Sequence, residues 1–176
     1  MRILRHLLAI GLCPGVAALL VPSLLVSGDE VASWPPVLLG AALIALGLVL
    51  MAQTIALFAT VGDGTLAPWD PTSRLVVRGP YRRVRNPMIS GVLCVLLGEA
   101  LLFTSTALLA WWALFLAINA IWFPLVEEPG LRQRFGADYE VYRAAVPRWL
   151  PRLRPWTSDA CPPSAPGGRR AWRAGR

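Results

Sequence analysis

The chain has 176 residues, of which 56% are hydrophobic, and its formal net charge is +7. Soluble domains are typically about 45–50% apolar, and here the excess lies in long runs, so the pattern excludes an ordinary soluble domain. The basic residues are all arginines that flank these runs, which indicates membrane topology rather than nucleic-acid binding.

Four apolar runs approach the ~20 residues that a helix needs to cross a bilayer. The first, 7–26, follows Arg2, Arg5 and His6, so it also fits a signal peptide. Its length and the three later runs favour a retained helix. The later runs are 36–61, 87–103 and 106–126. We therefore expect an all-α polytopic membrane protein with about four transmembrane helices.

The arginines all fall on one side of this arrangement. Arg2 and Arg5 precede the first run, five arginines lie in the loop 62–86, and ten follow the fourth run. The loop 28–35 carries two acidic residues and no arginine. By the positive-inside rule, both termini are cytoplasmic, and we expect a bacterial inner-membrane location.

The region after the fourth run predicts a cytoplasmic amphipathic helix at 127–145. Gly136 permits a bend in this helix, and Pro147 ends it. The extended segment 146–155 follows, with Trp149 and Trp156 suited to the headgroup layer. The apolar residues of the helix recur at three- or four-residue spacing, and they are Leu131, Phe135, Tyr139 and Tyr142.

The loop 73–91 is the first candidate site. Its arginine-rich tract runs into a predicted helix start, where Asn86 can cap the helix and Pro87 suits the first position. A helix N-terminus flanked by arginines binds anionic groups well. The alternative is a basic juxtamembrane loop without a ligand.

Glu127 and Glu128 form the second candidate, at the inner end of the fourth run. Adjacent carboxylates among arginines suit the ammonium or hydroxyl groups of a ligand. The alternative is a solvated acidic pair that begins a surface helix, where carboxylates favour the helix dipole.

Glu99 is the third candidate, because an ionisable residue within a membrane run is costly and is often functional. Gln53 and Asn119 are polar residues of other runs that we expect to face it, and hydrogen bonding between helices is favoured over catalysis. The single histidine and three cysteines show no metal-ligand or disulfide pattern.

Four short motifs occur in order between residues 73 and 151. They are Leu75-Val76 before Gly79-Pro80-Tyr81, Arg85-Asn86-Pro87-Met88 with Gly91, Glu127-Glu128-Pro129, and Phe135-Gly136 with Tyr139, Tyr142 and Val146-Pro147-Arg148. In order and spacing this set resembles the isoprenylcysteine carboxyl methyltransferase family and its phospholipid methyltransferase relatives. The resemblance covers a little under half of the chain.

The resemblance implies methyl transfer from S-adenosylmethionine to a hydrophobic or lipid-like acceptor, a carboxylate or an amine, at the cytoplasmic membrane face. It implies Glu127 and Arg85 as catalytic residues and no metal. It places Tyr81 against the sulfonium by cation–π attraction. The implied cofactor-binding residues are Arg74, Leu75, Val76, Tyr81, Arg82, Arg85, Asn86, Pro87, Met88, Ile89, Gly91, Glu127 and Glu128.

Three positions depart from the family pattern. Asn86 stands where the family usually has histidine, and Ile89 stands where it has tyrosine. Phe123 occupies the position of a substrate-associated arginine in the eukaryotic prenylcysteine enzymes, so a prenylcysteine carboxylate is not the implied substrate. We therefore expect a transmembrane helix pair at 1–61 and a methyltransferase-like region at 62–155. The composition of residues 156–176, which are rich in Pro, Gly, Ala, Ser and Arg, predicts a disordered basic tail.

Two other functions are open at this point. A non-catalytic protein of the same fold would bind anionic lipid or a partner through its basic face. A small-molecule transporter is the third option, although four helices without internal repeats fit it poorly.

Overall fold

Helices make up the regular structure of the chain. The structure is a computed structural model, and it describes residues 11–25, 34–60 and 75–157. Within those ranges there is no strand, so the all-α expectation is confirmed for them. In chain order the helices are η1 (Gly11–Leu20), α2 (Val21–Leu25), α3 (Trp34–Thr60), η2 (Gly79–Arg82), α4 (Pro87–Leu102), α5 (Thr106–Trp122), η3 (Phe123–Glu127) and α6 (Glu128–Ala145).

All four apolar runs form helices where the structure describes them. Two stretches are long and apolar enough to cross a membrane, Trp34–Phe58 and Thr106–Ala145. The apolar helices Gly15–Leu25 and Pro87–Leu102 are shorter. The expected four helices are thus present, whereas four membrane crossings remain a prediction.

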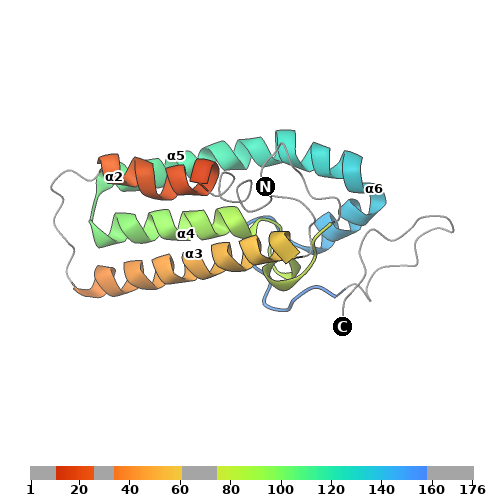
Figure 1. Cartoon of the computed structure of the whole chain (residues 1–176), viewed down its shortest axis with the longest axis horizontal. Helices are drawn as coiled ribbons and strands as arrows, with labels where there is room; N and C mark the ends of the chain where they lie inside the picture. Colours follow the sequence, from red (N-terminus) through yellow and green to blue (C-terminus); the bar gives the residue numbers. More distant parts are fainter. Residues whose placement is uncertain (1–10, 26–33, 61–74, 158–176) are drawn as a thin grey trace.

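Glycine brings α3 and α4 together along a close seam (Figure 1). Gly40 and Gly47 of α3 lie opposite Gly98 and Gly91 of α4, so the two helices are antiparallel. A Cβ atom at Gly47 would stand 2.5 Å from the Gly91 carbonyl oxygen, and one at Gly40 would stand 2.7 Å from the Gly98 carbonyl oxygen. Only glycine fits there, and such close approach is typical of helices that associate in membranes.

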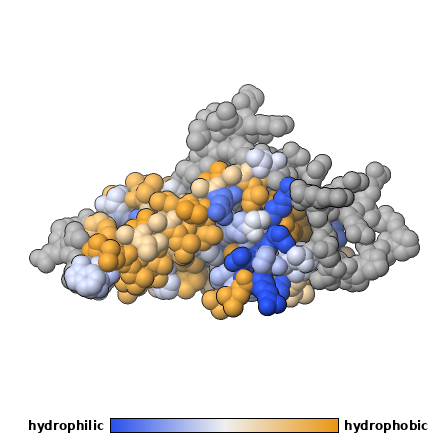
Figure 2. Space-filling model, turned by 90° about the horizontal axis from the view of Figure 1, so that it is seen from below, coloured by the Kyte–Doolittle hydropathy of each residue, from blue (hydrophilic) through white to orange (hydrophobic). Residues whose placement is uncertain are grey.

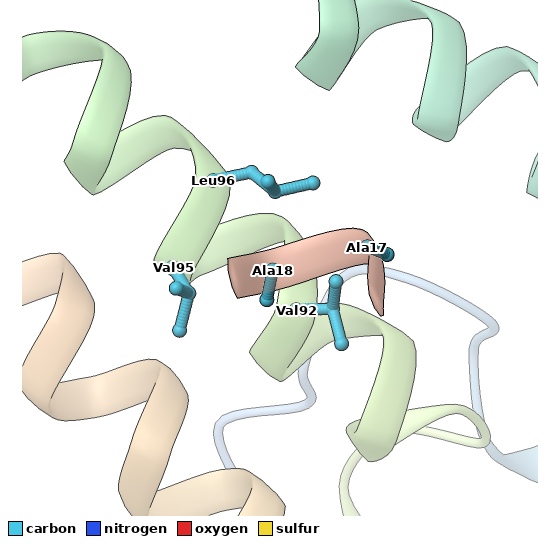
Figure 3. Close-up of a cluster of buried hydrophobic side chains, with 5 residues drawn as sticks. All are labelled: Ala17, Ala18, Val92, Val95 and Leu96. Carbon is cyan, nitrogen blue, oxygen red and sulfur yellow. The ribbon is translucent and has the colours of Figure 1, made fainter. Parts of the chain in front are cut away.

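A small apolar core joins η1 to α4. Figure 3 shows Ala17 and Ala18 of η1 beside Val92, Val95 and Leu96 of α4. All five side chains are buried, and Val92 is completely so. The small side chains of the two alanines let η1 approach α4 closely.

Two indole groups fasten α5 to its neighbours. Trp111 Nε1 donates a hydrogen bond to the Ala17 carbonyl at 3.0 Å, and Trp112 Nε1 donates to the Leu93 carbonyl at 3.1 Å. An unpaired N–H group costs several kcal/mol in hydrocarbon. These bonds therefore satisfy the indoles and fix the register of α5 against η1 and α4.

The outer surfaces of the long helices are apolar. Leu38 and Leu46 of α3 and Ile121 of α5 are more than half exposed. Figure 2 shows hydrophobic residues over much of the helical body and hydrophilic residues gathered toward one end. Such surfaces suit lipid better than water, in agreement with the membrane prediction.

The bend that Gly136 permits in the predicted amphipathic helix is present in α6 as a reversal of the chain. Gly136 has φ 53° and ψ −128°, which breaks the helix into two halves. The expected apolar residues do share one core, because Tyr139 and Tyr142 are buried with Leu131 and Phe135 packed against them. The reversal at Gly136, rather than one continuous helical face, brings them together.

Trp156 also departs from expectation. It is 7% exposed and its ring lies 5.9 Å from that of Tyr142, so the headgroup position expected for it is wrong. Its large apolar ring fills the core beneath α6. Trp149 is half-buried and lies edge-on to Phe123 at 5.8 Å.

Candidate functional site

The charged end of the molecule is built from three segments: η2 with residues 83–86, the junction of η3 with α6, and residues 146–156. Backbone hydrogen bonds join the first segment to the third. The Arg85 N–H donates to the Pro147 carbonyl at 2.9 Å, and the Arg152 N–H donates to the Arg83 carbonyl at 2.9 Å. The arginine tract is therefore held in place on its backbone as well as through its side chains.

Glu128 is the centre of an arginine cluster. Its side chain is 5% exposed, and its carboxylate pairs with Arg85 at 2.9 Å, Arg148 at 2.7 Å and Arg143 at 3.1 Å. Three positive charges around one buried carboxylate offset the cost of removing it from water. Within the described part of the chain, Glu128 thus connects the segment before α4, the second half of α6 and the segment after α6.

The reversal of α6 makes this cluster possible. Glu128 and Arg143 are fifteen residues apart, which is about 22 Å in a straight helix, yet their side chains form an ion pair. Arg132 and Glu140 also pair, at 2.6 Å, on either side of Gly136. A Cβ atom at Gly136 would meet nothing within 4 Å, so the position requires glycine for its positive φ and not for space.

Two buried donors next to this cluster have no partner in the described part of the chain. They are Arg85 Nε and Asn86 Nδ2. Asn86 occupies the N-cap position of α4, but its side chain makes no capping hydrogen bond, so the expected capping role is wrong, while Pro87 does begin the helix as expected. Buried polar groups normally find partners, so this pair marks a place where a ligand with acceptor oxygens would be stabilised.

Glu127 contrasts with its neighbour. It is half-buried, and its carboxylate makes no hydrogen bond or ion pair with the other residues that the structure describes. Glu127 ends the π-helical turn η3, in which the Glu128 N–H bonds to the carbonyl of Phe123, five residues back. Pro124 lies inside this turn and lacks an N–H donor. π-turns of this kind are frequent at functional sites.

Tyr81 lies close to Glu127. Burial raises the pKa of its hydroxyl well above the ordinary value, and the nearby Tyr142 and Glu127 raise it further, so Tyr81 is neutral at physiological pH. Its ring lies 5.8 Å from that of Phe58 at the end of α3. The backbone of Tyr81 is also fixed, because Tyr142 Oη donates to its carbonyl at 2.7 Å.

The remaining predicted site residues lie around this centre. Leu75 is buried in the core beneath α6, and Val76 is buried beside it in sequence. The Arg82 Nε donates to the Trp156 carbonyl at 2.7 Å. The cofactor role of these residues stays a prediction.

The first turns of α4 carry four more predicted residues. Pro87 and Met88 are buried and Ile89 is half-buried, whereas Gly91 meets Gly47 across the helix seam. Arg74 lies outside the described residues. Glu127, Tyr81, Arg85 and Asn86 thus gather at one place, while Gly91 has a packing contact of its own.

Glu99 lies far from this end. It follows Gly98 of α4, and Gly98 faces Gly40 of α3. Gln53 lies thirteen residues after Gly40 on α3, which is about 20 Å along the helix axis. Asn119 lies near the opposite end of α5 and donates to the Phe115 carbonyl of its own helix. The expectation that Gln53 and Asn119 face Glu99 is therefore wrong.

Arg143 and Arg148 belong to the site through their ion pairs with Glu128, but they are not among the predicted site residues. Arg148 belongs to the Val146-Pro147-Arg148 motif, so a signal for it was present. Arg143 had no signal, because its contact with Glu128 depends on the reversal at Gly136. Within the described residues, no group of three or more His, Cys, Asp or Glu side chains is placed to hold a metal.

Comparison with known proteins gives one match. The sequence model of a family described as phospholipid methyltransferase matches residues 36–138, which is more than half of the chain and runs from α3 into the second half of α6. No curated protein and no solved structure shows significant similarity.

Proposed function

The chain belongs to the phospholipid methyltransferase family, and from that premise we propose that it transfers a methyl group from S-adenosylmethionine to a hydrophobic or lipid-like acceptor at its charged end. The family implies methyltransferase activity in general, and the apolar helices fit a membrane protein. The cofactor, the acceptor class and the residues that bind them are the proposal.

The unpartnered donors Arg85 Nε and Asn86 Nδ2 carry this proposal. S-adenosylmethionine has a carboxylate, an ammonium group and ribose hydroxyls. A carboxylate placed at Arg85 would receive a charge-assisted hydrogen bond, which is stronger than a neutral one. The same arginine is held by Glu128 through another nitrogen, Nη1, so its orientation is fixed before the ligand binds.

Glu127 suits the positive or hydroxyl-bearing parts of the cofactor. Of the two carboxylates it is the one without an ion pair among the described residues, since three arginines engage Glu128. The neutral ring of Tyr81, with Phe58 beside it, offers an aromatic face to a sulfonium cation. The predicted roles of the two glutamates thus separate into ligand binding for Glu127 and positioning for Glu128.

Methyl transfer by in-line displacement depends mainly on alignment of donor and acceptor and on exclusion of water. S-adenosylmethionine supplies the methyl group on its sulfonium, and the chain supplies the alignment. We propose that the apolar acceptor arrives sideways from the bilayer, between α4 and α5. A carboxylate acceptor needs no general base. For an amine acceptor, Glu127 is the available carboxylate.

We further propose that the charged end faces the cytoplasm of a bacterial inner membrane, with both termini on that side. All seventeen basic residues are arginines placed outside the apolar runs, and the described arginines cluster at the end that holds Glu128. The positive-inside rule favours this orientation.

The test is transfer of a labelled methyl group. Full-length protein in lipid nanodiscs would be incubated with methyl-labelled S-adenosylmethionine and a membrane lipid extract. We expect label in the lipid fraction, and we expect Glu127→Gln to lower the rate by about tenfold or more, since it removes a charged contact to the ligand. Glu140→Gln, which alters an exposed carboxylate of α6, is the matched control. A folded wild-type protein that labels no lipid would contradict the proposal.

A further inference from the structure

Two leucines beyond α6 lie almost fully exposed. Leu150 is 80% exposed and Leu153 is 93% exposed. Unlike the exposed leucines of α3 and α5, they do not belong to a long apolar helix. Isolated exposed apolar side chains are normal, whereas contiguous ones mark membrane or protein interaction sites, so the surroundings of these two leucines decide their role.

The segment 146–155 is anchored and is not a loose tail. It begins at the buried Val146, which is 1% exposed, and is followed directly by the buried Trp156, which is 7% exposed. Between them the Arg152 N–H bonds to the Arg83 carbonyl, and the Trp156 N–H bonds to the Arg82 carbonyl at 2.8 Å. The two leucines therefore project from a backbone whose position is set by the rest of the fold.

This segment adjoins the apolar end of α5. Trp149, next to Leu150, packs edge-on against Phe123 at the start of η3. The neighbours of Phe123 are open to the outside, with Trp122 52% and Leu125 70% exposed. The ring contact of Trp149 thus connects the segment that carries the exposed leucines to the apolar end of α5.

The charge around the leucines has one sign. Arg83 and Arg154 are exposed, and residues 146–157 include no acidic side chain. Apolar side chains flanked by arginines are typical of segments that lie in the membrane interface and favour anionic lipids. We propose that residues 146–155 dock on the bilayer leaflet at the charged end, with Leu150 and Leu153 among the acyl chains and Arg83 and Arg154 at anionic headgroups.

This docking would keep the arginine cluster of Glu128 at headgroup depth. Arg148 and Arg152 belong to the same segment, and they are bonded inward, to Glu128 and to the Ala145 carbonyl. One face of the segment therefore holds the site together while the other meets lipid. The proposal does not rest on methyl transfer, because the leucines would meet lipid in an inactive protein as well.

A fluorescent label attached at Leu150 or Leu153 tests whether these positions are buried in lipid. Each of Leu150→Cys, Leu153→Cys and the control Ala137→Cys would be made in a chain whose three native cysteines are replaced. Ala137 is exposed and follows the reversal at Gly136. The labelled proteins are studied in nanodiscs of phosphatidylcholine, with and without phosphatidylglycerol, and in lipid-free amphipol. Quenching by neutral acrylamide measures access to water.

We expect acrylamide quenching at positions 150 and 153 to fall about threefold from amphipol to nanodiscs, and to fall further with phosphatidylglycerol, since apolar burial and arginine attraction act together. Quenching at position 137 should stay unchanged.

Equal quenching at all three positions in nanodiscs would overturn the proposal. Shielding that is already complete in amphipol would show that protein, such as a second copy, covers the leucines, and would overturn it too. Equal quenching at positions 150 and 153 in nanodiscs with and without phosphatidylglycerol would overturn the assignment of the arginines to anionic headgroups.

Discussion

Between α3 and α4, backbone meets backbone at paired glycines, and the nearest atoms there belong to backbone and apolar side chains. Around Glu128, three arginines from separate segments meet one carboxylate. The first region depends on volume, because close contact leaves no room for a methyl group. The second depends on charge, because a buried carboxylate is tolerated only with its partners.

The difference indicates how each region fails. The glycine seam should be sensitive to any added atom and indifferent to salt. The arginine cluster should accept small changes in volume but not a lost charge, and part of its stabilisation should be screened by salt because the arginines are partly exposed. The candidate site lies in the second region, since Arg85 and Asn86 directly precede α4 while Glu127 and Glu128 stand at the end of η3 and the start of α6.

The largest effect is expected at the seam. Gly47→Leu should prevent folding or lower the free energy of unfolding by more than about 3 kcal/mol, because overpacking displaces backbone. Even the first carbon of a side chain added at Gly47 would lie only 2.5 Å from the Gly91 carbonyl oxygen. Thermal unfolding in detergent would measure the loss. Gly130→Leu is the control, since a Cβ atom at Gly130 meets nothing within 4 Å. Equal stability of the two variants would show that the seam is not closely packed.

A second large effect is expected at Glu128. Glu128→Gln should lower the free energy of unfolding by about 2 kcal/mol, because three arginines lose their shared negative partner. The loss is smaller than for a fully buried ion pair, because the arginines are partly exposed to solvent. The measurement is the unfolding midpoint at low and high salt. The difference from the wild type should shrink as salt rises, whereas that of a seam variant such as Gly47→Ala should not. A salt-independent loss at Glu128 would remove the contrast between the regions.

The reversal in α6 should give an intermediate effect. Gly136→Ala should lower the free energy of unfolding by about 1–2 kcal/mol, because a side chain at φ 53° is strained. Chemical denaturation of the purified protein would measure it. Ala137→Gly, at the next position, should have a smaller effect. If Gly136→Ala were neutral, α6 would run straight, and Arg143 would not reach Glu128.

The smallest effect is expected from pH at Tyr81. Its pKa in the fold is raised above the unfolded value of about 10, so the folded state holds its proton more tightly. That contribution to stability is present below about pH 10 and is lost as pH rises above it. Unfolding midpoints measured across this range should fall with pH, and the slope should be shallower in Tyr81→Phe. An identical slope in the variant would show that the Tyr81 hydroxyl has the same pKa in the folded and unfolded states.

The helices were largely predictable from the sequence, because the ends of the long apolar runs lie close to the ends of the helices. Pro87 begins α4 where expected, and the run 106–126 covers α5 and nearly all of η3. The family was also predictable, because its motifs are short and ordered. The match extends to residue 36, beyond the motifs, over a helix that had seemed merely hydrophobic.

The contacts between distant residues were not predictable in the same way. Local spacing predicted one amphipathic helix in which Gly136 permits a bend, but the positive φ that folds the helix back at this glycine was not predictable. Trp156 looked interfacial by residue type and is buried by its tertiary setting. Gln53 was paired with Glu99 by polarity alone, although the register of the α3–α4 seam separates them.

The central claim is that the two adjacent glutamates have different tasks, with Glu127 binding S-adenosylmethionine and Glu128 holding the arginines in place. A calorimetric titration of S-adenosylmethionine into wild type, Glu127→Gln and Glu128→Gln, with unfolding measured on the same samples, tests it most directly. We expect saturable binding by the wild type. Glu127→Gln should bind at least about tenfold more weakly at unchanged stability, and Glu128→Gln should lose stability as well as affinity. Folded wild-type protein without saturable binding, or Glu127→Gln with wild-type affinity, would contradict the account.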